Sequence, residues 1–168
     1  MIDFQQRGNL LIVGAPGSGR TVTLMTLVAA NAQVYPPSQI HFHLIDFGGH
    51  QLRAAFSQLP HVAGSYDGDD LDHVRRLLSN LQSELDSRRR LFESMGIVDF
   101  SRYLKSAPEP AELPAIMTII NNYSGFQEAF NNQVDELIGL LREGGDYGLY
   151  FALSSDRFPT GKVADLIR

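Results

Sequence analysis

A short run near the N-terminus has the residue types and spacing that bind phosphate. Gly14 to Thr21 reads Gly-Ala-Pro-Gly-Ser-Gly-Arg-Thr, which fits the pattern G-x-x-x-x-G-K-[ST] except that Arg20 replaces the lysine. Glycines allow backbone N–H groups to point at a phosphate, and the N-terminus of a following helix adds partial positive charge. The predicted phosphate-binding residues are Gly14, Pro16, Gly17, Ser18, Gly19, Arg20 and Thr21. The alternative is a tight turn in which the glycines serve geometry alone.

The segments on either side of this run predict how it is positioned. The apolar run Leu10 to Val13 precedes it and reads as a strand, and a helix is expected to follow as far as about Ala32. Further strands are predicted at Ile2–Phe4, Ile40–Ile45, Ala115–Ile120 and Leu149–Ser154, and further helices from Asp69 or Asp70 to Met95 and at Gln133–Arg142. Strands that alternate with helices predict an α/β domain with a mostly parallel sheet and helices on both faces.

Composition limits the possible functions. With 168 residues and 43% hydrophobic content, the chain is long enough for one domain with a substantial core. Its net charge of −5 argues against a surface devoted to nucleic acid. No apolar run approaches about 18 residues, so no membrane span is expected in this segment. The absence of cysteine excludes disulfides and thiolate metal sites.

Four other residues have side chains that could take part in a site. His41 and His43 share one face of a predicted strand, where coverage by a neighbouring element is the main alternative to a metal pair. Asp46 ends that strand and serves either as a turn former or as a site carboxylate. Arg88 lies near the edge of the apolar stripe of the long helix, where it is a weak candidate for reaching an internal carboxylate or a ligand.

The order of several segments resembles the FtsK/SpoIIIE ATPase family. In nucleotide hydrolases with such a loop, a later apolar strand ends in Asp-Glu, whereas the strand Met117 to Ile120 ends here in Asn121 and Asn122. The resemblance is greatest to the tandem ATPase domains of EssC and EccC in type VII secretion. Besides the loop and the Asn pair, it rests on Leu44–Gly49, Leu59–Val62, Leu113-Pro114, Arg142–Gly145 and Ser154–Arg157.

The resemblance implies a role for each matching position. The fold would be a P-loop NTPase of the RecA/FtsK type that binds ATP, with Thr21 and Asn121 near magnesium. Asn122 would lie near the attacking water, and Ser155 would be the sensor at the end of the last strand. A further strand is also implied beside Leu10–Val13, so we expect this chain to be part of a longer one with an open side at that strand.

The departures from the family pattern predict little or no ATP hydrolysis. The flat guanidinium of Arg20 does not replace an ammonium that fits between two phosphates. Asn121 offers an uncharged oxygen to magnesium, so it would hold the ion weakly. Asn122 cannot accept a proton near neutral pH, and a general base contributes about 10²- to 10⁴-fold in rate.

These features leave three functions open. The first is a regulatory or substrate-receptor domain of a membrane-anchored secretion ATPase, on its cytoplasmic side, that binds ATP with little or no hydrolysis. Its implied partners are neighbouring ATPase domains and a secreted helical-hairpin substrate. The second is a working ATPase or DNA translocase in which Asp46, Asp146 or Asp156 replaces the missing base. The third is an interaction module without nucleotide.

Overall fold

The chain forms a parallel sheet covered by helices on both faces. The computed structural model describes residues 8–107, 111–130, 134–159 and 162–166, so the predicted strand at Ile2–Phe4 lies outside the described residues. The sheet has five parallel strands in the order β1-β5-β4-β2-β3. The strands are β1 (Leu10–Val13), β2 (Ile40–Asp46), β3 (Val62–Asp67), β4 (Ala115–Asn121) and β5 (Leu149–Ser155). The predicted α/β class is confirmed.

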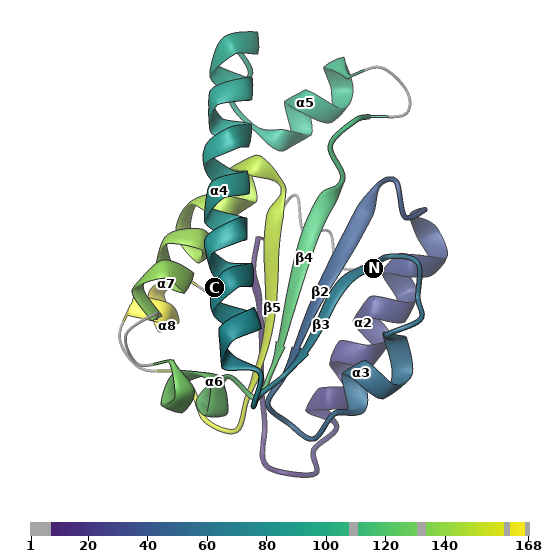
Figure 1. Cartoon of the computed structure of the whole chain (residues 1–168), viewed down its shortest axis with the longest axis vertical. Helices are drawn as coiled ribbons and strands as arrows, with labels where there is room; N and C mark the ends of the chain where they lie inside the picture. Colours follow the sequence, from purple (N-terminus) through teal and green to yellow (C-terminus); the bar gives the residue numbers. More distant parts are fainter. Residues whose placement is uncertain (1–7, 108–110, 131–133, 160–161, 167–168) are drawn as a thin grey trace.

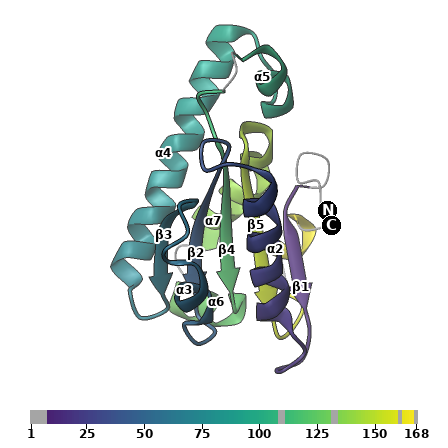
Figure 2. The same cartoon turned by 90° about the vertical axis from the view of Figure 1, so that its right-hand side faces the viewer.

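The helices divide into two layers around the sheet. The helices are α2 (Arg20–Val34), α3 (Gln51–Phe56), α4 (Leu71–Met95), α5 (Phe100–Ser106), α6 (Tyr123–Ala129), α7 (Val134–Glu143) and α8 (Lys162–Leu166), with a 3₁₀ turn at Gly144–Tyr147. Figure 1 shows α4, α6, α7 and α8 on one face and α2 and α3 on the other. Figure 2 looks onto the second face, with α2 in front of the strands. Each layer encloses its own apolar core, so both faces of the sheet are buried.

The long helix agrees closely with its prediction. Val74, Leu78 and Leu85 face the core, and the helix ends at Gly96, which has φ +66° as a left-handed C-terminal cap requires. Arg75, Arg76 and Arg90 are exposed on the opposite side, as expected for a solvated face. The last turns of α4 extend past the sheet and pack against α5 (Figure 1). A small separate core of Phe92, Phe100 and Tyr103 joins them there.

Arg88 binds carbonyl groups inside the protein. Its side chain is only 2% exposed, and its two terminal nitrogens donate to the carbonyl oxygens of Tyr147 (3.0 Å) and Pro114 (2.9 Å). Its Nε donates to Glu84 at 2.7 Å. Its carboxylate partner is therefore a neighbour on the same helix whose side chain is 38% exposed, and not an internal carboxylate. The other two partners precede β5 and β4, so Arg88 ties α4 to the N-terminal ends of both central strands.

Strand β1 stands at one edge of the sheet. It pairs with β5, and no strand covers its other side among the described residues. The open side expected at this strand and the further strand of a longer chain stay predictions.

The structure places the histidine pair His41 and His43 on β2. No cluster of three or more His, Asp or Glu side chains suited to a metal occurs among the described residues. Burial and the neighbouring His41 lower the pKa of His43 to about 4, and its Nδ1 has no hydrogen-bond partner in the described part of the chain. The folded state therefore holds His43 neutral.

This neutral histidine predicts acid sensitivity. Because the pKa of His43 is lower when folded than the unfolded value of 6.5, its stabilising contribution is complete above pH 6.5 and declines as the pH falls toward 4. The expected loss is about 3 kcal/mol at most. Urea unfolding across this range should show it, and His43→Gln should flatten the dependence. The control Arg90→Gln, on the exposed face of α4, should leave the pH dependence as in the unmodified protein; equal flattening by both variants would contradict the assignment.

Candidate functional site

The parallel strands bring the predicted site residues to one edge of the sheet. Val13 at the end of β1 pairs in register with Ser155 at the end of β5. Asn121 at the end of β4 pairs with Asp46 at the end of β2. The glycine-rich loop begins directly after Val13, so loop, sensor serine and Asn pair meet where parallel α/β sheets place their ligands.

Glycine is required at several positions of the loop. Gly17 has φ +79° and Gly19 has φ +90°, a region that other residues rarely adopt. A Cβ on Gly14 would lie 2.4 Å from Ser18 Oγ, so a larger residue there would require the exposed Ser18 side chain to move. The Gly14 N–H donates to the carbonyl oxygen of Ser155 (3.2 Å), which anchors the loop to β5.

The loop leads into an uncapped helix N-terminus. Ala15 to Gly19, including Pro16 and Ser18, are exposed. Gly19 is the N-cap of the 15-residue helix α2, and no side chain caps its amides. The first N–H groups of a helix have no partner within it. This end of α2 is therefore suited to an anion.

Arg20 adds a positive charge to the same place. It is half-buried, and its Nη1 has no hydrogen-bond acceptor in the part of the chain that the structure describes. An arginine guanidinium keeps its charge and can bind phosphate oxygens with two parallel hydrogen bonds. An unpaired guanidinium nitrogen beside a glycine-rich loop is consistent with a missing anionic ligand.

Thr21 and Asn121 lie within hydrogen-bond distance. Thr21 Oγ1 donates to Asn121 Oδ1 (3.2 Å), which also accepts a hydrogen bond from Ser154 Oγ (2.8 Å). On its other side, Asn121 Nδ2 donates to Asp46 Oδ1 (2.9 Å). Asn121 is 2% exposed, so it is the buried centre of a network that joins α2, β5 and β2 to β4. The structure brings Thr21 and Asn121 together, and their metal role stays a prediction.

Asp46 acts both as a turn former and as a member of the site. Its Oδ1 accepts from the Gly48 N–H (2.8 Å) and its Oδ2 from the Leu52 N–H (2.9 Å), which holds the turn into α3. The same carboxylate accepts from Asn121. A Cβ on Gly48 would lie 2.3 Å from Asn121 Nδ2, so glycine is needed for this close approach.

Asn122 caps a helix. Its backbone is left-handed at φ +65°, a conformation that asparagine tolerates better than most residues. Its Oδ1 accepts from the Gly125 N–H (3.4 Å) at the start of α6, and its Nδ2 donates to the Phe47 carbonyl (3.1 Å). Both ends of the amide are therefore occupied by the protein itself.

Ser155 belongs to a second polar cluster beside the loop. Its hydroxyl lies 3.1 Å from Ser124 Oγ, which donates to Asp156 Oδ1 (2.5 Å). The Ser124 hydrogen bond, with the nearby Arg157 and Arg20 charges, holds the pKa of Asp156 below its usual value. Asp156 is therefore an anion at neutral pH and a weak base.

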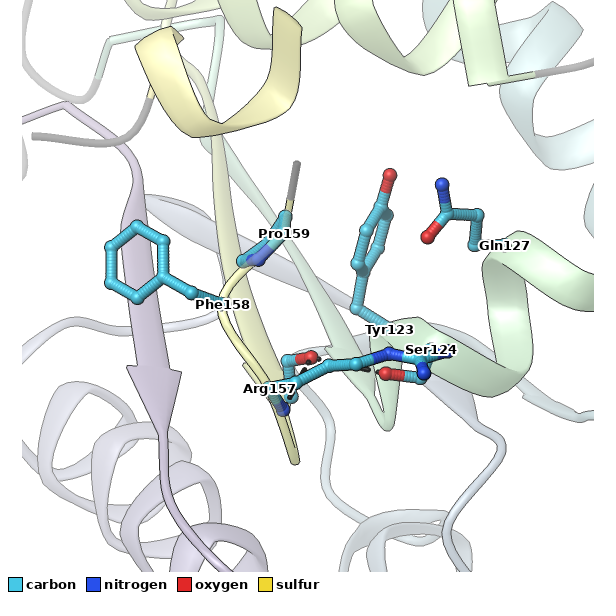
Figure 3. Close-up of a pocket in the computed structure, with 7 residues that line it drawn as sticks. Tyr123, Ser124, Gln127, Arg157, Phe158 and Pro159 are labelled. Atoms are coloured by element: carbon cyan, nitrogen blue, oxygen red, sulfur yellow. Dashed lines mark hydrogen bonds between the residues drawn. The ribbon is translucent and has the colours of Figure 1, made fainter. Parts of the chain in front are cut away.

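A pocket of about 240 Å³ lies beside Ser124 and Ser155. Figure 3 shows it between α6 and the segment after β5. It is lined by Tyr123, Ser124, Gln127, Ser155, Arg157, Phe158 and Pro159. The hydroxyl of Tyr123 is buried without a partner among the described residues, and Phe158 is 63% exposed. Ser155 thus belongs to the pocket wall and also anchors the loop.

Sequence reasoning missed part of this arrangement. Ser124 and Ser154 were not singled out, because a serine in or after an apolar strand carries no distinctive signal. For Asp46 the only signal was its place at a strand end, which also suits a turn. The residues Gly14, Thr21, Asn121, Asn122 and Ser155 all lie at the C-terminal edge of the sheet.

Sequence comparison identifies the family. The family model described as FtsK/SpoIIIE family matches residues 1–157. The chain belongs to the FtsK/SpoIIIE family. Membership in this family of P-loop ATPases implies nucleotide binding.

Curated relatives of this FtsK/SpoIIIE domain are secretion proteins. The ESX secretion system protein YukB of Bacillus subtilis (strain 168) is 30% identical over 154 residues, covering 92% of this chain and 10% of YukB. The type VII secretion system protein EssC of Staphylococcus aureus (strain MRSA252) is 28% identical over 166 residues, covering 98% of this chain and 11% of EssC. The chain therefore spans about a tenth of the length of these relatives.

Solved structures of such proteins have the same fold. The cytoplasmic domain of EssC superposes with a TM-score of 0.91 at 25% identity, covering 99% of this chain and 32% of that one. Thermomonospora curvata EccC (ATPases 2 and 3), in complex with a signal sequence peptide, superposes with a TM-score of 0.90 at 24% identity, covering 99% and 31%. The predicted P-loop ATPase fold is confirmed. No helix among the described residues has the length and apolar character needed to cross a membrane.

Proposed function

We propose that this chain is a nucleotide-binding domain of a type VII secretion ATPase that has a regulatory or substrate-receptor role and hydrolyses little or no ATP. The proposal rests on the two residues at the end of β4. Asn121 and Asn122 stand where the family pattern has Asp and Glu, and both amides are held in internal hydrogen bonds. Binding needs the loop and the α2 N-terminus, which are intact, whereas hydrolysis needs a base that activates water.

None of the other candidate carboxylates is placed to supply this base. Asp46 accepts hydrogen bonds from the Gly48 and Leu52 amides and from Asn121, so its oxygens are engaged within the protein. Asp156 accepts from Ser124, and its pKa lies below the usual value. Asp146 lies in the turn that precedes β5, at the opposite end of that strand from the loop. These positions argue against replacement of the missing base.

The partners that we propose follow from the relatives and from the pocket beside Ser155. EccC, which has this fold, has been solved with several ATPase domains and a signal sequence peptide. We therefore propose that neighbouring ATPase domains and a secreted helical-hairpin substrate bind this domain, on the cytoplasmic side of a membrane-anchored protein. Ser155 supports a regulatory link because it lines the pocket and accepts the Gly14 hydrogen bond.

The nucleotide proposal predicts binding without turnover. A fluorescent ATP analogue should bind saturably to the purified domain, and phosphate release with magnesium should stay at the level of a protein-free control. Arg20→Gln should weaken binding by about 10-fold or more, because it removes a charge-assisted phosphate contact. Arg90→Gln on the exposed face of α4 is the matched control and should bind like the unmodified domain. Magnesium-dependent ATPase activity that Thr21→Ala abolishes would instead support a working motor.

The receptor proposal predicts selective capture of a substrate. A small secreted helical-hairpin protein should be retained by the immobilised domain more strongly than by an unrelated P-loop domain. Gln127→Arg should reduce this retention, because Gln127 lines the pocket and a larger charged side chain would fill it. Equal recovery by both immobilised domains would remove the support for a receptor role.

A further inference from the structure

The outer face of α2 carries no charged side chain. No Asp, Glu, Lys or Arg occurs between Arg20 and Asp46, although such residues make up 20% of the chain. Leu24, Leu27 and Val28 are buried against the sheet. The helix has no acidic residue in its first turn and no basic residue in its last turn, the charges that usually stabilise the ends of an exposed helix. A helix without a charged face is typical of one that is buried on both sides.

The exposed part of this face is largely apolar. Val22 is 62% exposed and Val34 is 49% exposed, and Figure 2 shows α2 in front of the strands. The hydroxyl of Thr23 donates to the Gly19 carbonyl oxygen (3.0 Å), and that of Thr26 donates to the Val22 carbonyl oxygen (2.9 Å). Both threonine hydroxyls are therefore bonded to the helix itself and are not free donors to water.

The outward residues follow a spacing that suits a second helix. Val22, Thr26, Ala29 and Gln33 succeed one another by four, three and four residues, which is the spacing of a coiled-coil seam. This series of steps is the same in both chain directions. An antiparallel copy would therefore place Val22 opposite Gln33 and Thr26 opposite Ala29. The short side chains of Thr26 and Ala29 at the centre would allow the two helices to approach closely.

A second copy of this chain suits this face better than a charged partner does. Nucleic acid or an anionic lipid surface would need Lys and Arg side chains, which the outer face of α2 lacks. The chain has a net charge of −5, so two copies repel one another through most of their surface, and the uncharged α2 face adds nothing to that repulsion. In an antiparallel pair, the positive N-terminus of each α2 also lies near the negative C-terminus of the other.

We propose that two copies of this chain associate through α2, with the helices antiparallel about a two-fold axis between Thr26 and Ala29. The association does not depend on nucleotide, so it stands apart from the proposed function. One pair of 15-residue helices is a small interface, and we expect a weak dimer with a dissociation constant of about 10 to 100 µM. The glycine-rich loop of each copy would lie at the end of this interface, because it leads directly into α2.

Sedimentation velocity without nucleotide tests the dimer. From about 1 to 300 µM, the mean mass should rise from that of one chain toward that of two. Thr26→Glu sets two like charges near the two-fold axis and should leave one chain at every concentration. Ser87→Glu, the same added charge at an exposed position of α4, should dimerise like the unmodified protein.

Three results in sedimentation would overturn the inference. A mass of one chain throughout the range would show that α2 is left to a partner of another kind. Equal dimerisation of Thr26→Glu and the unmodified protein would show that the copies meet elsewhere. Loss of the dimer in both glutamate variants would show that added charge alone separates the copies. Far-UV circular dichroism and urea unfolding establish that each variant is folded.

Disulfide formation tests the orientation of the helices. The chain has no cysteine, so any disulfide reports on introduced residues. A mixture of Val22→Cys and Gln33→Cys chains should form mixed dimers in air, whereas each variant alone should form few, because identical positions would be about 16 Å apart along the antiparallel pair. Replacing Gln33→Cys by Ser87→Cys in the mixture is the control and should abolish the mixed dimer. Val22→Cys chains that join one another more readily than the mixture would overturn the antiparallel arrangement.

Discussion

Replacing Asn121 by aspartate is expected to lower the free energy of unfolding by about 3 to 5 kcal/mol, the usual penalty for a buried charge without a partner. The variant exchanges the Nδ2 donor, 2.9 Å from Asp46 Oδ1, for an oxygen, so two carboxylates would face one another in a buried site. Like charges at such a distance raise the pKa of one carboxyl. The penalty should therefore shrink as the pH falls, which urea unfolding at pH 8 and pH 5.5 would measure.

The matched control is Asn80→Asp. Asn80 is exposed on α4, so the same chemical change there should shift stability by no more than about 0.5 kcal/mol. Millimolar magnesium should restore part of the stability of Asn121→Asp, because paired carboxylates are ligands for that ion. A variant as stable as the Asn80 control would mean that the hydrogen bond between Asn121 and Asp46 does not hold this edge together.

Replacing Arg88 by methionine is expected to destabilise the domain by a similar amount, about 3 to 5 kcal/mol. Methionine fills much of the same volume but donates no hydrogen bond. The buried carbonyl oxygens of Tyr147 and Pro114 would lose their donors, and each orphaned group costs about 1 to 3 kcal/mol. The guanidinium also lies over the ring of Phe100, 5.7 Å from its centroid, so a cation–π contact is lost as well.

Two further variants separate charge from geometry at this position. Arg88→Lys keeps the positive charge but not the planar fork, so its loss should be intermediate. Arg90→Met changes an exposed arginine on the same helix and should stay within about 0.5 kcal/mol. Urea unfolding would measure these differences as shifts of the midpoint at unchanged m-values. Equal stability of Arg88→Met and Arg90→Met would show that the buried guanidinium contributes nothing to the joint between α4 and the sheet.

Short-range patterns predicted much of the fold correctly. The strand before Gly14, the loop and the helix after it follow from glycine conformation and apolar spacing within a few residues. The long helix was predicted for the same reason, since its stripe and Gly96 are local features. The observed α2 continues two residues beyond the predicted Ala32 to Val34 and still ends before Pro36. Pro36 restricts the conformation only of the residues next to it, so the sequence did not fix the last residue of this helix.

Segments with weak local preferences were not predicted. β3 reads Val-Ala-Gly-Ser-Tyr-Asp and has no regular alternation, and it becomes a strand because it pairs with β2 at the edge of the sheet. The short helix α6 depends on the left-handed Asn122, whose side chain caps it. Such elements are stabilised by contacts made after folding rather than by their own propensity.

The sequence alone determined the chemical inventory of the site: a glycine loop, an arginine in place of lysine, a threonine and two asparagines at a strand end. Only the tertiary structure decided how these groups are used. The bond between Asn121 and Asp46 joins residues 75 positions apart, and the bond between Thr21 and Asn121 joins residues 100 apart. Strand order and register bring them together, and both depend on how the whole sheet packs. Whether an asparagine is free to face a ligand or is already saturated is therefore decided by long-range pairing, which local sequence preferences do not encode.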